Sequence, residues 1–366
     1  MIKHAFSGVA LAAMLTVGAA GGAVAADKEV RIFNWSDYID ASILEDFTKE
    51  TGIKVVYDVY DSMEILETKM LAGGSGYDIV VPTDRNLKRM IDVGVFQKLD
   101  KSKVPNLSHM WDEITTRLAT YDPGNEIAVN YMWGTTGIGY NVNKIKEIMP
   151  DAPVDSMDMF FKPEVAAKFK DCGIYMLDSP DDVIPAALSY LGLPPDSKDP
   201  AEIEKAGELL MSIRPYIRKF HSSEFIQALA NGDICLALGY SGDVIQARDR
   251  AAEAGNDVEV AYSIPKEGAL LWMDSMAIPK DAPNPEAALA FINYIQQPEV
   301  IAKATNYVSY ANGNKDSQAF IDKEILEDKT IYPDDAVMKK LYTTTPNDPK
   351  VQRVVTRLWT KIKSGT

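Results

Sequence analysis

Histidine and cysteine are nearly absent from this sequence. Only three of its 366 residues are His and two are Cys. His109 and His221 stand far apart, and neither belongs to an HExxH motif or lies near a cysteine. Transition-metal sites in proteins draw on clusters of these residues, so we expect no metal site. No nucleophile stands with a base in a pattern typical of an enzyme, and we therefore expect neither catalytic residues nor a cofactor.

A phosphate-binding loop and an excess of basic residues are also missing. The glycine cluster Gly73-Gly74-Ser75-Gly76 precedes a predicted strand and lacks a following Gly-Lys-Ser, which favours a simple turn. The chain has 38 Lys and Arg against 53 Asp and Glu, a net charge of −15. This balance argues against nucleic acid or an anionic membrane surface as partner. It is compatible with a cationic ligand.

A long apolar run occurs at the N-terminus. Lys3 precedes an apolar stretch over residues 6–17, and the small residues Ala23-Val24-Ala25-Ala26 follow it. A membrane-spanning helix needs about 20 apolar residues without such an ending. The pattern predicts a signal peptide over residues 1–26 that is cleaved on export. In an oxidising compartment Cys172 and Cys235 most simply form one disulfide, and two buried free thiols are the alternative.

Strand-like and helix-like stretches alternate along the chain. The predicted strands include residues 28–33, 54–60, 77–82 and 234–240, and the predicted helices include residues 41–51, 62–71, 223–230 and 285–296. Such alternation is typical of an α/β fold with parallel strands covered by helices. No linker divides the chain, which favours two lobes of interleaved segments. We expect the chain to cross between them near residues 135–144 and 258–268.

Aromatic residues stand close to carboxylates where predicted strands end. The pattern comprises Trp35, Asp37 and Tyr38; Tyr240 and Asp243; Trp272 and Asp274; and Tyr310. In open α/β sheets, ligands bind beyond the carboxyl ends of the strands. An ammonium favours carboxylates and aromatic faces, and each cation–π contact contributes about 0.5–2 kcal/mol. Aromatic walls also suit a methylene chain, so the pattern predicts a diamine site. A core aromatic beside a surface acid is the alternative for each pair alone.

Two other functions remain open at this point. A secreted hydrolase would use Asp178, Asp182 and Asp243 as acid and base, and would need two carboxyl groups at a fixed separation. A binding protein for another cationic solute or a sugar is the second alternative. Sugar binding favours amide side chains, in which the aromatic and carboxylate set is poor.

Several longer blocks resemble one protein family. They are NWSDYI, ETGIKVVYDVYDS, YDIVVP, YMWGTTGIGYN, FHSSEFIQALANGDICLALGY, SIPKEG and PNDPKVQRVVTRLWTKIKSG. Together they resemble the periplasmic putrescine/spermidine-binding proteins of bacterial ABC importers. The resemblance implies a type II-like periplasmic binding protein of two α/β lobes, with a polyamine in the cleft between them. It further implies a non-enzymatic protein of the periplasm that delivers its ligand to a membrane permease. We expect it to be a monomer.

The same resemblance implies roles for individual residues. The residues implied to line the methylene chain are Trp35, Tyr38, Tyr240, Trp272 and Tyr310. Asp274, helped by Ser36, would bind one ammonium. Asp182 and Asp243 would bind the other, with Asp37 and Thr83 in support.

The resemblance also bears on the disulfide and the lobes. It implies that Cys172 and Cys235 form a disulfide within the second lobe. We expect lobe 1 to comprise residues 27–136 and 264–320, and lobe 2 to comprise residues 137–263 and 321–366.

Departures from the family pattern leave the preferred polyamine open. Tyr240 stands where putrescine-binding relatives usually carry Trp, and Trp272 where they usually carry Phe. Trp at the second position is the spermidine-binding pattern, whereas Asp37 is the putrescine-like residue. Asp84-Arg85 follows Thr83, where relatives have small or aromatic residues, and puts a cation at the predicted rim. Putrescine, cadaverine, agmatine and spermidine all remain candidates.

Overall fold

The structure, a computed structural model, describes residues 28–365 and has the predicted α/β fold. Its strands are β1 (Glu29–Trp35), β2 (Lys54–Tyr60), β3 (Ile79–Val80), β4 (Ala128–Asn141), β5 (Ile174–Met176), β6 (Lys219–Phe220), β7 (Leu236–Tyr240), β8 (Val260–Ser263), β9 (Leu271–Ala277) and β10 (Ala311–Asn312). Its α-helices are α1 (Ala41–Thr51), α2 (Met63–Ala72), α3 (Asp84–Asp92), α4 (Asp112–Leu118), α5 (Val142–Ile148), α6 (Asp158–Phe161), α7 (Pro163–Phe169), α8 (Pro180–Tyr190), α9 (Pro200–Ile213), α10 (Glu224–Ala230), α11 (Ser241–Ala254), α12 (Pro285–Ile295), α13 (Pro298–Val308), α14 (Lys323–Glu327), α15 (Asp335–Met338) and α16 (Pro349–Ser364).

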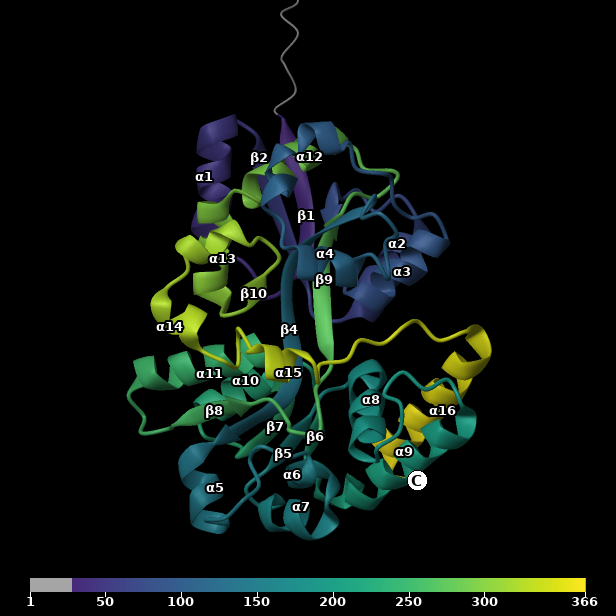
Figure 1. The fold of residues 1–366 in the computed structure, drawn as a ribbon, viewed down its shortest axis with the longest axis vertical. Helices are drawn as coiled ribbons and strands as arrows, with labels where there is room; N and C mark the ends of the chain where they lie inside the picture. Colours follow the sequence, from purple (N-terminus) through teal and green to yellow (C-terminus); the bar gives the residue numbers. More distant parts are fainter. Residues whose placement is uncertain (1–27, 366) are drawn as a thin grey trace, which may run out of the picture.

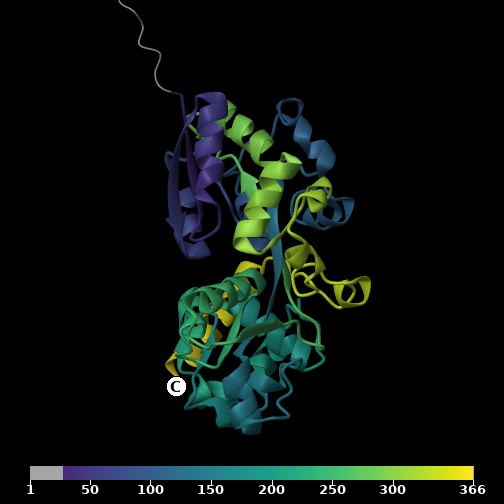
Figure 2. The same cartoon turned by 90° about the vertical axis from the view of Figure 1, so that its left-hand side faces the viewer.

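Strand β4 joins an upper and a lower half of the molecule (Figures 1 and 2). The strand order is β2-β1-β3-β9-β4-β7-β5-β6, and β8 and β10 also pair with β4. The first part of β4 pairs with β9 and β10, and its last part pairs with β7 and β8. We call β1, β2, β3, β9 and β10 with their helices the upper half, and β5 to β8 with theirs the lower half. The predicted crossing near residues 135–144 coincides with the lower part of β4 as far as Asn141, and its last three residues begin α5.

The prediction of parallel strands is correct for part of the sheet and wrong for its centre. β1 pairs in parallel with β2 and β3, and β5 pairs in parallel with β6 and β7. β4 pairs antiparallel with β7, β8, β9 and β10. The antiparallel pairing of β4 with β9 arises because one strand carries the chain down between the halves and the other carries it back up.

Separate apolar cores fill the two halves. The lower core gathers side chains from residues 138–262 together with Val351, Val355 and Trp359 of α16. The upper half has one core on each face of its sheet, and the core that contains Phe33 also contains Ile331 and Leu341. We therefore propose the two predicted lobes with one change, in which the last boundary falls after Leu341 and not after residue 320.

The predicted disulfide is confirmed. Cys172 and Cys235 are joined, with their Cα atoms 5.7 Å apart. The bond ties the segment before β5 to the segment before β7, within the lower half.

The predicted signal peptide lies outside the described residues. Within residues 28–365, no helix has both the length and the apolar character needed to cross a membrane.

Candidate functional site

Four aromatic rings form a continuous row between the two halves. The ring centroids of Tyr240 and Trp272 are 5.6 Å apart, those of Trp272 and Tyr310 are 5.2 Å apart, and those of Tyr310 and Tyr38 are 5.5 Å apart. Each pair meets edge to face, which is the favoured geometry of aromatic pairs. We call these four residues the aromatic row. Tyr240 belongs to the lower half and the other three to the upper half, so the row joins both.

Two glycines allow the row to lie close to the backbone. A Cβ atom at Gly134 would lie 2.7 Å from Cζ2 of Trp272, and one at Gly242 would lie 2.6 Å from the ring of Tyr310. Both distances are far below van der Waals contact. The sequence therefore fixes the place of these two rings through glycines in β4 and α11 as well as through the aromatics themselves.

Asp274 is a buried carboxylate at the upper end of the site. It lies in β9 and is only 5% exposed. The hydroxyl of Tyr38 donates to Oδ2 over 2.9 Å, and the hydroxyl of Thr83 donates to Oδ1 over 2.6 Å. Burial raises the pKa of Asp274 to about 7, although these two hydrogen bonds lower it. Both donors are neutral, so the carboxylate can still accept a cation.

Asp243 is the corresponding carboxylate of the lower half. It lies in the first turn of α11 and accepts a hydrogen bond of 2.6 Å from the hydroxyl of Tyr310. Burial raises its pKa to about 7, and the hydrogen bond from Tyr310 acts in the opposite direction. Tyr38 and Tyr310 are neighbours in the aromatic row, so Asp274 and Asp243 flank the same pair of rings.

Asp182 lies at the other end of the aromatic row. It lies in the first turn of α8 and accepts hydrogen bonds from the hydroxyls of Thr136, Ser179 and Tyr240. Among residues 28–365 it is the one of these three carboxylates that has a cation of the protein within ion-pair distance, because Nη2 of Arg85 lies 3.9 Å from its Oδ2.

The remaining predicted residues lie around this centre. Trp35 packs on Tyr60 with ring centroids 4.7 Å apart, and its Nε1 donates to the carbonyl oxygen of Val81 over 3.1 Å. Ser36 donates its backbone N–H to the carbonyl oxygen of Tyr60. Asp37 lies at the rim, with its side chain 58% exposed and 3.5 Å from Nη2 of Arg250 on α11.

Three residues at the site were missed from the sequence. Tyr131 donates its hydroxyl to the carbonyl oxygen of Tyr38 over 2.6 Å and packs against that ring. Thr136 and Ser179 bind Asp182. Ser179 directly precedes α8 and has Asp182 three residues later, which is a typical helix-start pattern and is the one signal that could have found it.

Asp178 does not join the other carboxylates. It accepts hydrogen bonds from Nε1 of Trp359 and from Nζ of Lys363, both on α16. The set of three aspartates expected for a hydrolase is therefore not assembled.

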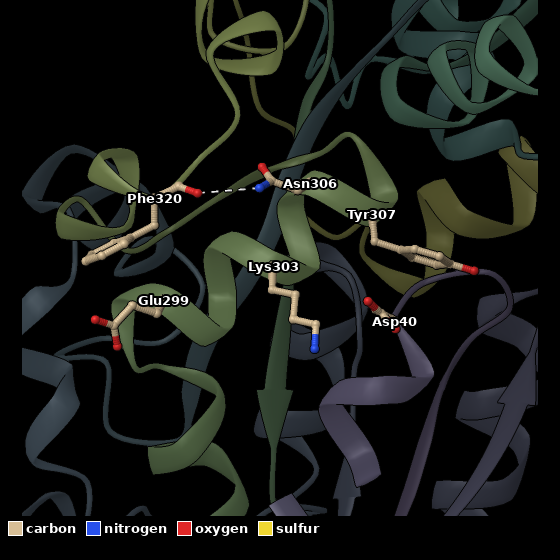
Figure 3. Close-up of a pocket in the computed structure, with 6 residues that line it drawn as sticks. All are labelled: Asp40, Glu299, Lys303, Asn306, Tyr307 and Phe320. Atoms are coloured by element: carbon tan, nitrogen blue, oxygen red, sulfur yellow. Dashed lines mark hydrogen bonds between the residues drawn. The ribbon is translucent and has the colours of Figure 1, made fainter. Parts of the chain in front are cut away.

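A separate hollow lies on the outer surface of the upper half. Figure 3 shows Phe320 and Tyr307 at its two ends with Lys303 between them. Its other lining residues are Asp40, Glu299 and Asn306. It contains none of the predicted ligand-binding residues and no member of the aromatic row.

Two α/β halves joined by crossing strands, with aromatic residues and carboxylates gathered between them, form the architecture of a solute-binding protein. The family of bacterial extracellular solute-binding proteins matches residues 42–333, and this chain belongs to that family.

Individual relatives share almost the whole chain. The chain is 54% identical to the putrescine-binding periplasmic protein SpuD of Pseudomonas aeruginosa, over 100% of both chains. It is 48% identical to the putrescine-binding periplasmic protein PotF of Escherichia coli, over 99% of this chain and 98% of PotF. A solved structure described as a putative spermidine/putrescine ABC transporter from Listeria monocytogenes has a TM-score of 0.81 and 32% identity, and covers 92% of this chain and 99% of its own.

Proposed function

We propose that this chain is a periplasmic polyamine-binding protein that captures a diamine of the putrescine type. The observation that carries this proposal is a pair of carboxylates, the buried Asp274 and the half-buried Asp243, that flank Tyr38 and Tyr310. Within residues 28–365, both carboxylates accept hydrogen bonds from neutral hydroxyls, and no Lys or Arg lies within ion-pair distance of either. Arg85 and Arg250 act on them only from farther away, and each is paired with another carboxylate, Arg85 with Asp182 and Arg250 with Asp37. Such carboxylates favour a cation supplied by a ligand.

The aromatic row supports the same ligand class. Aromatic faces attract an ammonium and provide apolar surface for the methylenes between two ammoniums. In this proposal Trp35, Tyr38, Tyr240, Trp272 and Tyr310 contact the chain of the ligand, Thr83 positions Asp274, and Ser36 and Asp37 lie at the entrance. A polyamine also fits the relatives, since SpuD and PotF are both named for putrescine.

Ligand binding would favour the closed arrangement of the two halves. Asp274 comes from the upper half and Asp243 from the lower half. A diamine that contacts both carboxylates gains both interactions only when the halves are together. That difference in affinity is what shifts the population toward closure.

Transport follows from the same proposal. The closed protein would deliver its ligand to the permease of an ABC importer. The chain would act as a monomer, and residues 1–26 would be removed on export. The intact mass of protein purified from the periplasm tests the cleavage site.

A calorimetric titration tests the proposed ligand. Putrescine, cadaverine, agmatine and spermidine should be titrated into purified protein, with glucose as the sugar control. One equivalent of putrescine should bind and be recovered unchanged. Binding of glucose alone, or of none of the amines, would contradict the proposal, and turnover of the amine would favour an enzyme.

Binding should weaken as the pH falls through 7. Burial raises the pKa of both Asp274 and Asp243 to about 7 in the free protein, whereas an ammonium favours the ionised carboxylate. The Kd for putrescine should therefore rise about tenfold for each carboxylate between pH 8 and pH 6. Amines with a pKa near that of Lys, about 10.4, stay charged over this range. Titrations in two buffers of different ionisation enthalpy would measure the released protons. A constant Kd without proton release would contradict the proposed contacts.

The same carboxylates give the opposite trend for the stability of the free protein. Their pKa is raised on folding, from 3.8 to about 7 for Asp274. The folded state therefore binds more protons than the unfolded state between these values, and this contribution to stability is lost as the pH rises toward 7. Because of these two carboxylates, the melting temperature of the free protein should be lower at pH 8 than at pH 5.5, as measured by thermal unfolding.

A further inference from the structure

Arg85 is a buried cation placed beside one of the carboxylates of the site. It is the second residue of α3, in the upper half, and is 6% exposed. The sequence-based expectation of a cation at the rim is therefore wrong, because α3 carries the side chain inward between the two halves. Nη1 donates to the hydroxyl of Thr344 over 3.0 Å. Nη2 lies 3.9 Å from Oδ2 of Asp182, and Nε lies 4.0 Å from Oδ2 of Asp181, both on α8 of the lower half. The guanidinium therefore faces two carboxylates across the site.

The charge of Arg85 is maintained in spite of its burial. Burial by itself lowers the pKa of Arg85, but the neighbouring carboxylates Asp182, Asp181 and Asp84 outweigh it and leave this pKa raised. Nε has no hydrogen-bond partner among the residues that the structure describes. The guanidinium is thus a fixed positive charge in the site. It is held mainly by electrostatic attraction to Asp181 and Asp182, and it donates a hydrogen bond to Thr344.

The three carboxylates of the site therefore differ in kind. Asp274 and Asp243 accept hydrogen bonds from hydroxyls and have no Lys or Arg within ion-pair distance among residues 28–365, although Arg85 lowers the pKa of Asp274 and Arg250 lowers that of Asp243 from farther away. Asp182, by contrast, lies 3.9 Å from Nη2 of Arg85. Tyr240 connects Asp182 to the aromatic row through a contact of 3.4 Å between its hydroxyl and Oδ2. A ligand long enough to extend along the row past Trp272 would bring its next ammonium to Asp182, and so toward Arg85.

We propose that Arg85 acts as a built-in substitute for a third ammonium and makes the site selective for diamines over triamines. This inference rests on the proposed polyamine function. A diamine places its two ammoniums at Asp274 and Asp243, which lie farther from Arg85 than Asp182 does, so the repulsion from Arg85 is weaker there. A triamine brings a third cation toward the carboxylate that Arg85 occupies, where two like charges repel each other in a buried site. Repulsion of this kind is a common source of specificity.

Replacement of Arg85 by Gln tests the inference. Gln removes the charge and keeps a donor for Thr344. The ratio of the putrescine to the spermidine affinity should fall by about tenfold or more in Arg85→Gln, mainly because spermidine binds better. Arg85→Lys keeps the cation and should keep a ratio close to that of the wild type. Arg85→Ser is the second neutral variant, in case Gln disturbs the fold.

Arg89→Gln is the matched control, because it removes the same charge from the same helix. Arg89 forms an ion pair of 2.7 Å with Glu67, and its Nη1 lies 3.9 Å from Asp181. The affinity ratio should change less than about twofold in this variant, since Arg89 does not face Asp182.

The outcomes separate this inference from the proposed function. If folded Arg85→Gln and Arg85→Ser keep the wild-type ratio of putrescine to spermidine affinity, Arg85 is not a selectivity residue and the inference is wrong. The same holds if both variants bind the two amines more weakly by the same factor. If Arg89→Gln shifts the ratio as much as Arg85→Gln, the effect comes from net charge and the inference is also wrong. If the wild type binds no polyamine, the proposed function itself fails.

Discussion

Replacement of Asp274 by Ala should abolish tight polyamine binding while the fold remains. In the proposed complex Asp274 binds one ammonium in a buried site, and its removal leaves that ammonium without a counter-charge. Loss of one partner of a buried charge pair costs about 2–5 kcal/mol, or roughly 30- to 4,000-fold in Kd. Calorimetry with putrescine at pH 8, where the wild-type carboxylate is ionised, measures the loss.

Two further variants make this test specific. Asp274→Asn keeps the shape of the side chain and an acceptor for Tyr38 or Thr83, so a comparable loss would assign the effect to charge. Asp46→Asn removes the same charge from the exposed surface of α1, where Asp46 contacts Lys49 and Lys303. It should bind putrescine as the wild type does.

The stability of Asp274→Ala is an independent check. A buried carboxylate with a pKa of about 7 is ionised at pH 8 at a cost to the folded state. Its removal should therefore leave the melting temperature at pH 8 unchanged or higher. A change in Kd below about tenfold in a folded variant would show that Asp274 does not bind the ammonium.

Much of the fold follows from local patterns in the sequence. The predicted helix over residues 41–51 and the predicted strand over residues 54–60 have the same bounds in α1 and β2. The length of β4 was not predicted, because its register shifts between Asn130 and Met132 and interrupts the alternation of side chains. The antiparallel centre was missed for another reason, since the direction in which two distant strands pair is decided by tertiary structure.

The candidate site could be predicted only in part. The aromatics and carboxylates stand at strand ends, where sequence order alone indicates that they converge. The place of Arg85 could not be deduced in this way. Its partners Asp181 and Asp182 belong to a helix of the other half, and the guanidinium reaches them only after the two halves come together. Asp37 is the opposite case, because its sequence position could be read but its exposure could not. Its place close to Trp35 predicts a site residue, and the structure shows its side chain at the exposed rim.

The second large effect is expected at Trp272, in the middle of the aromatic row. Its ring packs on Tyr310 on one side and on Tyr240 on the other. The part of the indole near Tyr240 extends the apolar wall toward Asp182 and away from the pair Tyr38 and Tyr310. A diamine held between Asp274 and Asp243 makes little use of that part, whereas a longer polyamine must pass along it.

Trp272→Phe should therefore shift the preference toward putrescine by weakening spermidine more than putrescine. Loss of one apolar contact in a binding pocket changes such a ratio by about 1–3 kcal/mol, or 10- to 200-fold. The fold should tolerate the change, because Nε1 of Trp272 is buried and has no hydrogen-bond partner within residues 28–365, so its removal breaks no hydrogen bond there. Both affinities should be measured in the wild type and in Trp272→Phe at the same salt and pH. Trp111→Phe, in which the exchanged ring packs on Trp133 outside the aromatic row, is the matched control and should keep the wild-type ratio. An unchanged ratio in Trp272→Phe would mean that the indole only packs the interior, and that Tyr240 or Arg85 determines the length of the polyamine.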